Sequence, residues 1–313
     1  MSLELSDPAA TAADAQLDDA ALAALDVLLH ALELEPLGND RFVVAGEPDR
    51  FTRVFGGQTV AQAMVAANAT VVDKEIHSLH AYFVEAGVPE QPLELAVDRV
   101  RDGRSISTRR VTVSQDARPL LVAMASFHAN TDGPEIASAP PPVPGPEHVP
   151  RLQDWVPGVP PELRLESRTW VDQPPPVELR IGEPPTFLGG AAGTGIRSHW
   201  MRLPRDVGDD PRLHAALLAY ASDYLLLDMA FRSQPPPFTP KASTGISLDH
   251  TIWLHRPLRF DAWHLHTQET IAISGHRGLV RGAIHDADGH LVATAMQDCL
   301  VRPESRPSTE PRS

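Results

Sequence analysis

LHAALLAYASDYLLLDMAFRSQPPPFTPKASTGISLDHTIWLHR, at residues 213–256, is the stretch around which the chain is organised. Its first part predicts a helix over 213–231, with one carboxylate, Asp223, in the middle of an otherwise apolar segment. After a proline-rich break, alternating residues predict a strand over 246–255, with Ser247 near its start. Because polar residues stand where core residues are expected, we expect a site between this helix and the sheet.

Composition limits the classes of function. The chain has 313 residues, 42% of them hydrophobic, which allows two domains with sizeable cores. A net charge of −14 argues against nucleic acid as a partner. The single Cys299 excludes an intramolecular disulfide and fits a reducing compartment. No signal peptide, peroxisomal C-terminal tripeptide or membrane-spanning apolar run is apparent, so we expect a cytoplasmic protein without a membrane span.

The first half predicts a helix followed by strands. We expect a disordered leader over 1–16 and an N-terminal domain over 17–133. Its predicted helices cover 17–34 and 58–72, and its predicted strands cover 41–45, 78–84, 93–101, 105–114 and 120–128. Residues 134–176 are dense in proline and predict an extended linker over the surface.

The second half, predicted as a C-terminal domain over 177–302 before a disordered tail at 303–313, repeats this plan. A strand at 196–203 precedes the helix at 213–231, and strands follow at 246–255, 263–273, 279–285 and 291–301. LLVAMASFH at 120–128 aligns with HLVATAMQD at 290–298, which indicates an internal duplication. Two helices, each wrapped by an antiparallel sheet, predict an α+β double hotdog. Gln297 falls where the first copy has Phe127, and this difference hints at function.

Paired glycines, Gly56 and Gly57, stand before the Ala-rich helix of the first half. They permit close backbone approach and leave free N–H groups at a positive helix end. The segment lacks the Walker lysine and the GxGxxG pattern, so tight packing of helix on sheet is the competing explanation.

The chain resembles the acyl-CoA thioesterase II family over about residues 20–302. The resemblance rests on the order and spacing of several blocks: RVFGGQTVAQAM (53–64), HSLHAYF (77–83), DRVRDGRSISTRRV (98–111), MASFH (124–128), LAYASDYLLL (218–227), LDHTIWLHRP (248–257), RGLVRG (277–282) and LVATAMQD (291–298). It implies a double hotdog that hydrolyses fatty acyl-CoA to fatty acid and coenzyme A, with no cofactor or metal. It also implies a homodimer or tetramer.

By motif, the family's catalytic Asp, Thr or Ser, and Gln fall on Asp223, Ser247 and Gln297. A carboxylate at Asp223 could take a proton from water, and partial desolvation would raise its pKa toward the working range. Ser247 and Gln297 could hold that water, because each can donate and accept. Backbone N–H groups would stabilise the oxyanion, with Gly56 and Gly57 as the candidate substrate-binding residues.

One departure from the family pattern bears on the substrate. Where family members commonly have a basic residue and proline, this chain has Glu85 and Ala86. A carboxylate near a phosphate route could weaken coenzyme A binding, so a catalytically weak acyl-CoA binding protein is one alternative.

A hotdog enoyl-CoA hydratase is a second alternative, because Asp209 and His214 keep the Asp-to-His interval of that family's helix opening. Pro211 and Arg212 replace its Asn and Pro, so Asp209 is better explained as a helix-start residue. A serine hydrolase is disfavoured because no GxSxG occurs. Histidine pairs such as His250/His255 lack the ligand spacing of metal sites.

Overall fold

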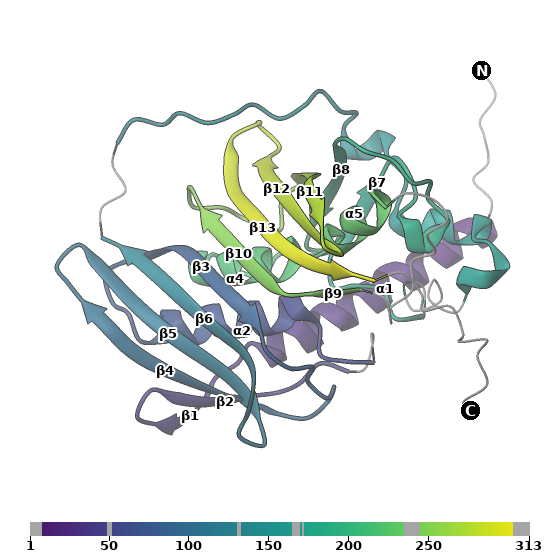
Figure 1. The fold of residues 1–313 in the computed structure, drawn as a ribbon. Helices are drawn as coiled ribbons and strands as arrows, with labels where there is room; N and C mark the ends of the chain where they lie inside the picture. The colour runs from purple at the N-terminus through teal and green to yellow at the C-terminus, as the bar shows by residue number, and fades with distance from the viewer. Residues whose placement is uncertain are drawn as a thin grey trace, which may run out of the picture.

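The chain folds around one large antiparallel sheet. The computed structural model describes residues 8–48, 52–129, 133–164, 170, 172–234 and 245–302. Within these residues 13 strands form a single sheet in the order β1-β2-β4-β5-β6-β3-β10-β13-β12-β11-β8-β7, with β9 paired to β13 (Figure 1). The strands of the first half are β1 (Glu35–Gly38), β2 (Arg41–Val44), β3 (Glu75–Phe83), β4 (Leu93–Asp102), β5 (Ile106–Gln115) and β6 (Arg118–His128). Those of the second are β7 (Glu178–Ile181), β8 (Arg197–Arg202), β9 (Gly245–Ser247), β10 (Asp249–Leu254), β11 (His264–Ser274), β12 (Arg277–Asp286) and β13 (Leu291–Val301).

The sheet order confirms the double hotdog. From the centre outward, β3, β6, β5 and β4 of the first copy mirror β10, β13, β12 and β11 of the second. The copies join where β3 pairs antiparallel with β10, with Leu79 opposite Ile252. Both residues are fully buried, so the seam belongs to the apolar core.

Each copy holds its helices against the inner face of the sheet (Figure 1). Helix α2 (Gly56–Ala69) is buried along most of its length, although Gln58, Thr59, Gln62 and Asn68 are among its buried residues. It packs against strands of its own copy and against α4 (Pro211–Ser222) of the second copy. Asp210 caps α4, because its carboxylate accepts the N–H of Arg212 at 2.9 Å. The two central helices therefore meet where the copies join.

The second central helix differs from the prediction of one helix over 213–231. Helix α4 ends at Ser222, Asp223 is its C-cap residue, and a separate helix α5 (Leu226–Arg232) follows. Leu225 has φ +67°, a left-handed conformation that no continuous helix can contain. Asp223 therefore lies at a helix end and not in mid-helix.

Several other boundaries also differ from the sequence prediction. Helix α1 (Pro8–Ala31) begins at Pro8, so residues 8–16 are helical and the expected leader is wrong there. The predicted strand 246–255 is broken at Leu248 into β9 and β10, because Leu248 leaves the ladder and accepts the N–H of Phe83 through its carbonyl. The short edge strands β1 and β7 were not expected.

The proline-rich segment is more ordered than an extended linker. It contains the short 3-10 helices η1 (Pro146–His148), η2 (Leu152–Gly158) and η3 (Pro161–Leu163). Leu152 is fully buried in the core, and the indole of Trp200 donates to the carbonyl of Pro144 at 2.8 Å. The segment therefore packs on the second copy after crossing from β6 (Figure 1). The expected boundary at 303 lies outside the described residues.

Among the helices of the described ranges, none combines the length and the apolar character needed to cross a membrane.

Candidate active site

Asp223, Ser247 and Gln297 come from three different elements and meet at one place. Ser247 is the last residue of β9, and Gln297 lies on β13. These two strands pair so that Ser247 lies opposite Cys299, which is two residues after Gln297. The Gln297 amide Nε2 donates to Ser247 Oγ at 2.6 Å. The Gln297 amide also lies near enough to the Asp223 carboxylate to lower its pKa. Gln297 is fully buried, while Asp223 keeps 8% of its surface exposed. The structure thus brings together all three predicted catalytic residues.

The surroundings of the Asp223 carboxyl change its pKa. Burial raises the pKa of its carboxyl above the usual value of 3.8. Three neighbours oppose this shift, in decreasing order: His250, the Gly57 N–H and the Gln297 amide. Desolvation is the largest cause, so the pKa of Asp223 stays raised, as expected for a catalytic carboxylate.

The predicted glycine pair lies directly against Asp223. The Gly57 N–H donates to Asp223 Oδ2 at 2.9 Å. A Cβ added at Gly57 would lie 2.3 Å from the Tyr220 carbonyl oxygen, and one at Gly56 would lie 2.8 Å from Asp223 Oδ2. Both glycines are thus needed for the N-terminus of α2 to approach the C-terminal end of α4. The close approach is of helix to helix, not of helix to sheet as the packing explanation held.

Two polar residues of this site were not predicted. His250, fully buried on β10, lies with its Nδ1 2.7 Å from Gln297 Oε1 and 3.8 Å from Asp223 Oδ1. Its Nε2 is 2.9 Å from the hydroxyl of Ser222, the last residue of α4. The alternation of the strand did contain the signal, because His250 lies on the same face as the core residue Ile252.

Cys299 is a further potential nucleophile beside Gln297, with its Sγ 3.6 Å from Gln297 Nε2. Burial raises the pKa of the Cys299 thiol far above its usual value, so the thiol stays protonated. A thiolate mechanism is therefore disfavoured.

The hydratase alternative finds no support in the geometry. Asp209 is exposed and pairs with Arg259. His214 Nε2 is 2.8 Å from the Gly208 carbonyl oxygen, and the Phe260 N–H donates to His214 Nδ1 at 3.1 Å. Because both ring nitrogens hold backbone groups, His214 has a structural role.

Other charged residues singled out in the sequence have local partners. Glu85 lies 3.7 Å from Arg118, with both side chains about half exposed. Within the described ranges, one group of three side chains could hold a metal ion, namely Asp286, Asp288 and His290. It lies in the turn after β12, where Asp286 accepts the N–H groups of Asp288 and His290. These hydrogen bonds explain the acidic turn without an ion.

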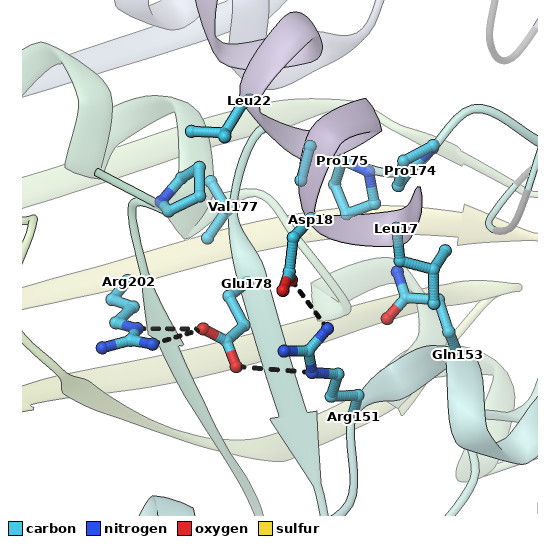
Figure 2. Close-up of a pocket in the computed structure, with 12 residues that line it drawn as sticks. Leu17, Asp18, Leu22, Arg151, Gln153, Pro174, Pro175, Val177, Glu178 and Arg202 are labelled. Atoms are coloured by element: carbon cyan, nitrogen blue, oxygen red, sulfur yellow. Dashed lines mark hydrogen bonds and ion pairs between the residues drawn. The ribbon is translucent and has the colours of Figure 1, made fainter. Parts of the chain in front are cut away.

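A hollow on the surface lies apart from the three predicted catalytic residues, between α1 and β7 (Figure 2). Its charged side chains pair with one another: Arg151 with Asp18 at 2.8 Å, and Arg202 with Glu178 at 2.8 Å. The Arg151–Asp18 pair joins α1 to the proline-rich segment, and the Arg202–Glu178 pair joins β8 to β7, so we assign the hollow a structural role.

Comparison with known proteins agrees with the fold. Residues 47–128 match the model of the acyl-CoA thioesterase N-terminal domain, and residues 107–301 match that of the C-terminal domain. Acyl-coenzyme A thioesterase 8 of Mus musculus is 33% identical over 87% of each chain. Acyl-CoA thioesterase 2 of Haemophilus influenzae is 32% identical over 89% of this chain and 98% of its own.

Solved structures show the same architecture. The tesB protein of Mycobacterium avium subsp. paratuberculosis superposes with a TM-score of 0.74 at 29% identity, covering 90% of this chain and all of its own. An acyl-CoA thioesterase II from Mycobacterium marinum gives 0.71 at 31% identity, with the same coverage. The class is therefore that of double-hotdog thioester hydrolases. Within this class, the chain belongs to the acyl-CoA thioesterase II family.

Proposed function

We propose that this chain hydrolyses fatty acyl-CoA, with Asp223 as general base for a water held by Ser247 and Gln297. The observation that carries the proposal is the meeting of these three side chains beside the N-terminus of α2. The similarity to acyl-CoA thioesterases supports the substrate class.

The reaction follows from the groups present. The Asp223 carboxylate takes a proton from water as the water oxygen bonds to the thioester carbonyl carbon, which contributes about 10²–10⁴-fold to the rate. The carbonyl electron pair moves to oxygen, and the Gly56 N–H at the positive end of α2 stabilises this oxyanion, because Gly57 is already bonded to Asp223. When the C–S bond breaks, Asp223 returns the proton to the sulfur of coenzyme A.

The orienting groups act on the same water. Ser247 Oγ and Gln297 Nε2 lie together at 2.6 Å, so a water between them and Asp223 has a fixed direction of attack. The Gly57 N–H, which donates to Asp223 Oδ2, and the nearby Gln297 amide favour the ionised carboxylate, which therefore can act as a base although it is buried.

Release of free thiol from acyl-CoAs of varied chain length, followed with a thiol-reactive dye, tests the proposal. Asp223→Asn should lower kcat at least about a hundredfold with little change in KM. Asp209→Asn is a matched control, because it removes an exposed carboxylate that the hydratase alternative requires and hydrolysis does not.

An unchanged kcat in Asp223→Asn would remove Asp223 from its role. Tight acyl-CoA binding without thiol release would instead support the acyl-CoA binding protein. Hydration of an enoyl-CoA that is lost in Asp209→Asn would support the hydratase.

A further inference from the structure

His250 joins the end of α4 to the predicted catalytic amide. Its ring is fully buried between Ser222 Oγ, 2.9 Å from Nε2, and Gln297 Oε1, 2.7 Å from Nδ1. A buried polar chain of this kind is rigid, because each member is held by the next. The chain runs from the helix that carries Asp223 to the strand that carries Gln297.

The carboxamide of Gln297 has two unlike ends, and only one orientation suits its neighbours. An ionised Asp223 can only accept hydrogen bonds, so the NH₂ end of Gln297 must face it. One hydrogen of this NH₂ goes to Ser247 Oγ at 2.6 Å, and the other points to Asp223 or to the water beside it. Oε1 is then left to face His250, which must donate through Nδ1–H.

Ser222 completes the assignment. When Nδ1 of a neutral imidazole carries the proton, Nε2 is an acceptor. The Ser222 hydroxyl lies 2.9 Å from Nε2 and 2.8 Å from the Ala219 carbonyl oxygen, and it donates to the ring when its single hydrogen points to Nε2. The reverse tautomer would require Gln297 to turn over and place Oε1 against the Asp223 carboxylate, where two acceptors repel each other.

We propose that His250 is a positioning residue, held by Ser222 in the Nδ1–H tautomer, that fixes the orientation of the Gln297 amide toward Asp223 and Ser247. This inference rests on the proposed hydrolysis and adds to it the group that orients the amide. His250 contacts neither the attacking water nor the thioester in this assignment. It acts through Gln297.

Two substitutions of similar polarity separate positioning from packing. His250→Asn keeps an amide N–H near the position of Nδ1, whereas the longer His250→Gln places its amide near that of Nε2. We expect His250→Gln to lower kcat about tenfold more than His250→Asn, with KM within about threefold in both. Packing alone would favour the larger glutamine, so equal losses or the reverse order would overturn the proposal. His255→Gln, a variant of an exposed residue on the same stretch, is the control.

The coupling to Gln297 gives a second readout. In a Gln297→Leu background, adding His250→Gln should lower kcat by no more than about twofold, since the two residues act as one unit. If the double variant instead lost kcat by the product of the two single-variant factors, the proposal would be overturned. If Asp223→Asn retains full turnover, the hydrolysis mechanism itself fails, whatever the His250 variants do.

A milder change covers the case in which the His250 variants do not fold. Ser222→Ala removes only the hydroxyl that fixes the tautomer, and we expect kcat to fall about fivefold at unchanged KM. Nitrogen-15 NMR of the histidine-labelled enzyme reports the tautomer directly, with the His250 signals assigned by their shift in Ser222→Ala. A protonated Nδ1 is expected. An unprotonated Nδ1, or an unchanged kcat in Ser222→Ala, would overturn the proposal.

Discussion

The two hotdog copies place different chemistry at the same position of the sheet. In the first copy, Ile76 on β3 is paired with Phe127 on β6, and both side chains are buried in the apolar core. In the second, His250 on β10 is hydrogen-bonded to Gln297 on β13. Equivalent strand pairs therefore carry an apolar core in the first copy and a polar site in the second. The comparison teaches that the site depends on side-chain replacement rather than on a special backbone at this position.

Phe127→Ala should give the largest change in free energy of unfolding. Phe127 is fully buried, and truncation of a buried phenylalanine costs about 3–5 kcal/mol through lost contacts and the cavity that remains. Urea denaturation measures the loss. The kcat of the folded fraction should stay within about threefold. A large fall in kcat at full folding would mean that the first copy also contributes to the chemistry.

Gln297→Leu gives the second copy an apolar residue at the position where the first copy has the apolar Phe127. We expect kcat to fall about a hundredfold, equal to about 2.7 kcal/mol in the barrier, because the amide no longer orients Ser247 and Asp223. Phe127→Leu at the equivalent position of the first copy is the matched control for thiol release. If both variants lose equal activity, the functional difference between the copies disappears.

Gly57→Ala tests the contact between the copies. An added Cβ would meet the Tyr220 carbonyl at 2.3 Å, so α2 must move away from α4 and withdraw the N–H that binds Asp223. We expect about a tenfold lower kcat and a loss of about 1–3 kcal/mol in stability, typical of overpacking. Gly182→Ala is the control, because a Cβ there meets nothing within 4 Å. An unaffected Gly57→Ala enzyme would contradict the required close approach.

Buried histidines of the second copy should make the free energy of unfolding depend on pH. Burial lowers the pKa of His266 to about 3 and holds that of His199 well below its usual value of 6.5. Below about pH 6.5 the unfolded chain binds protons that the folded chain does not, so the free energy of unfolding falls as pH falls toward 3.

Each histidine contributes on the order of 1 kcal/mol per pH unit at the steepest point. His266→Gln should therefore flatten this slope in urea denaturation between about pH 7 and 4, whereas replacement of the exposed His30 serves as the control. An unchanged slope in His266→Gln would show that His266 is not the titrating group.

Most of the fold was predictable, because alternation and turn residues are local signals. β13 was predicted to the residue, and the duplication gave the double hotdog. The break at Leu225 could not be predicted, since leucine has no preference for positive φ and only tertiary packing imposes it. The packing of residues 134–176 on the second copy was missed for a similar reason, because composition does not show which residues find a buried surface.

The sequence predicted which residues form the candidate site but not the hydrogen bonds between them. Asp223, Ser247 and Gln297 followed from the motifs, and the contact of Gly57 with Asp223 joins residues 166 positions apart. His250 was considered only as part of a metal pair, because one sequence does not reveal which strand lies beside it. The cytoplasmic location and the assembly into dimers or tetramers stay predictions.

The position of Asp223 between the start of α2 and the end of α4 has a consequence for stoichiometry. A pair of identical single-hotdog chains would repeat every substitution twice and so would carry two equal centres. In the fused polypeptide, Ile76 and Phe127 occupy the place that corresponds to the proposed centre. Under the proposed mechanism, each molecule should therefore offer a single reactive position, to which the first copy contributes the Gly57 N–H.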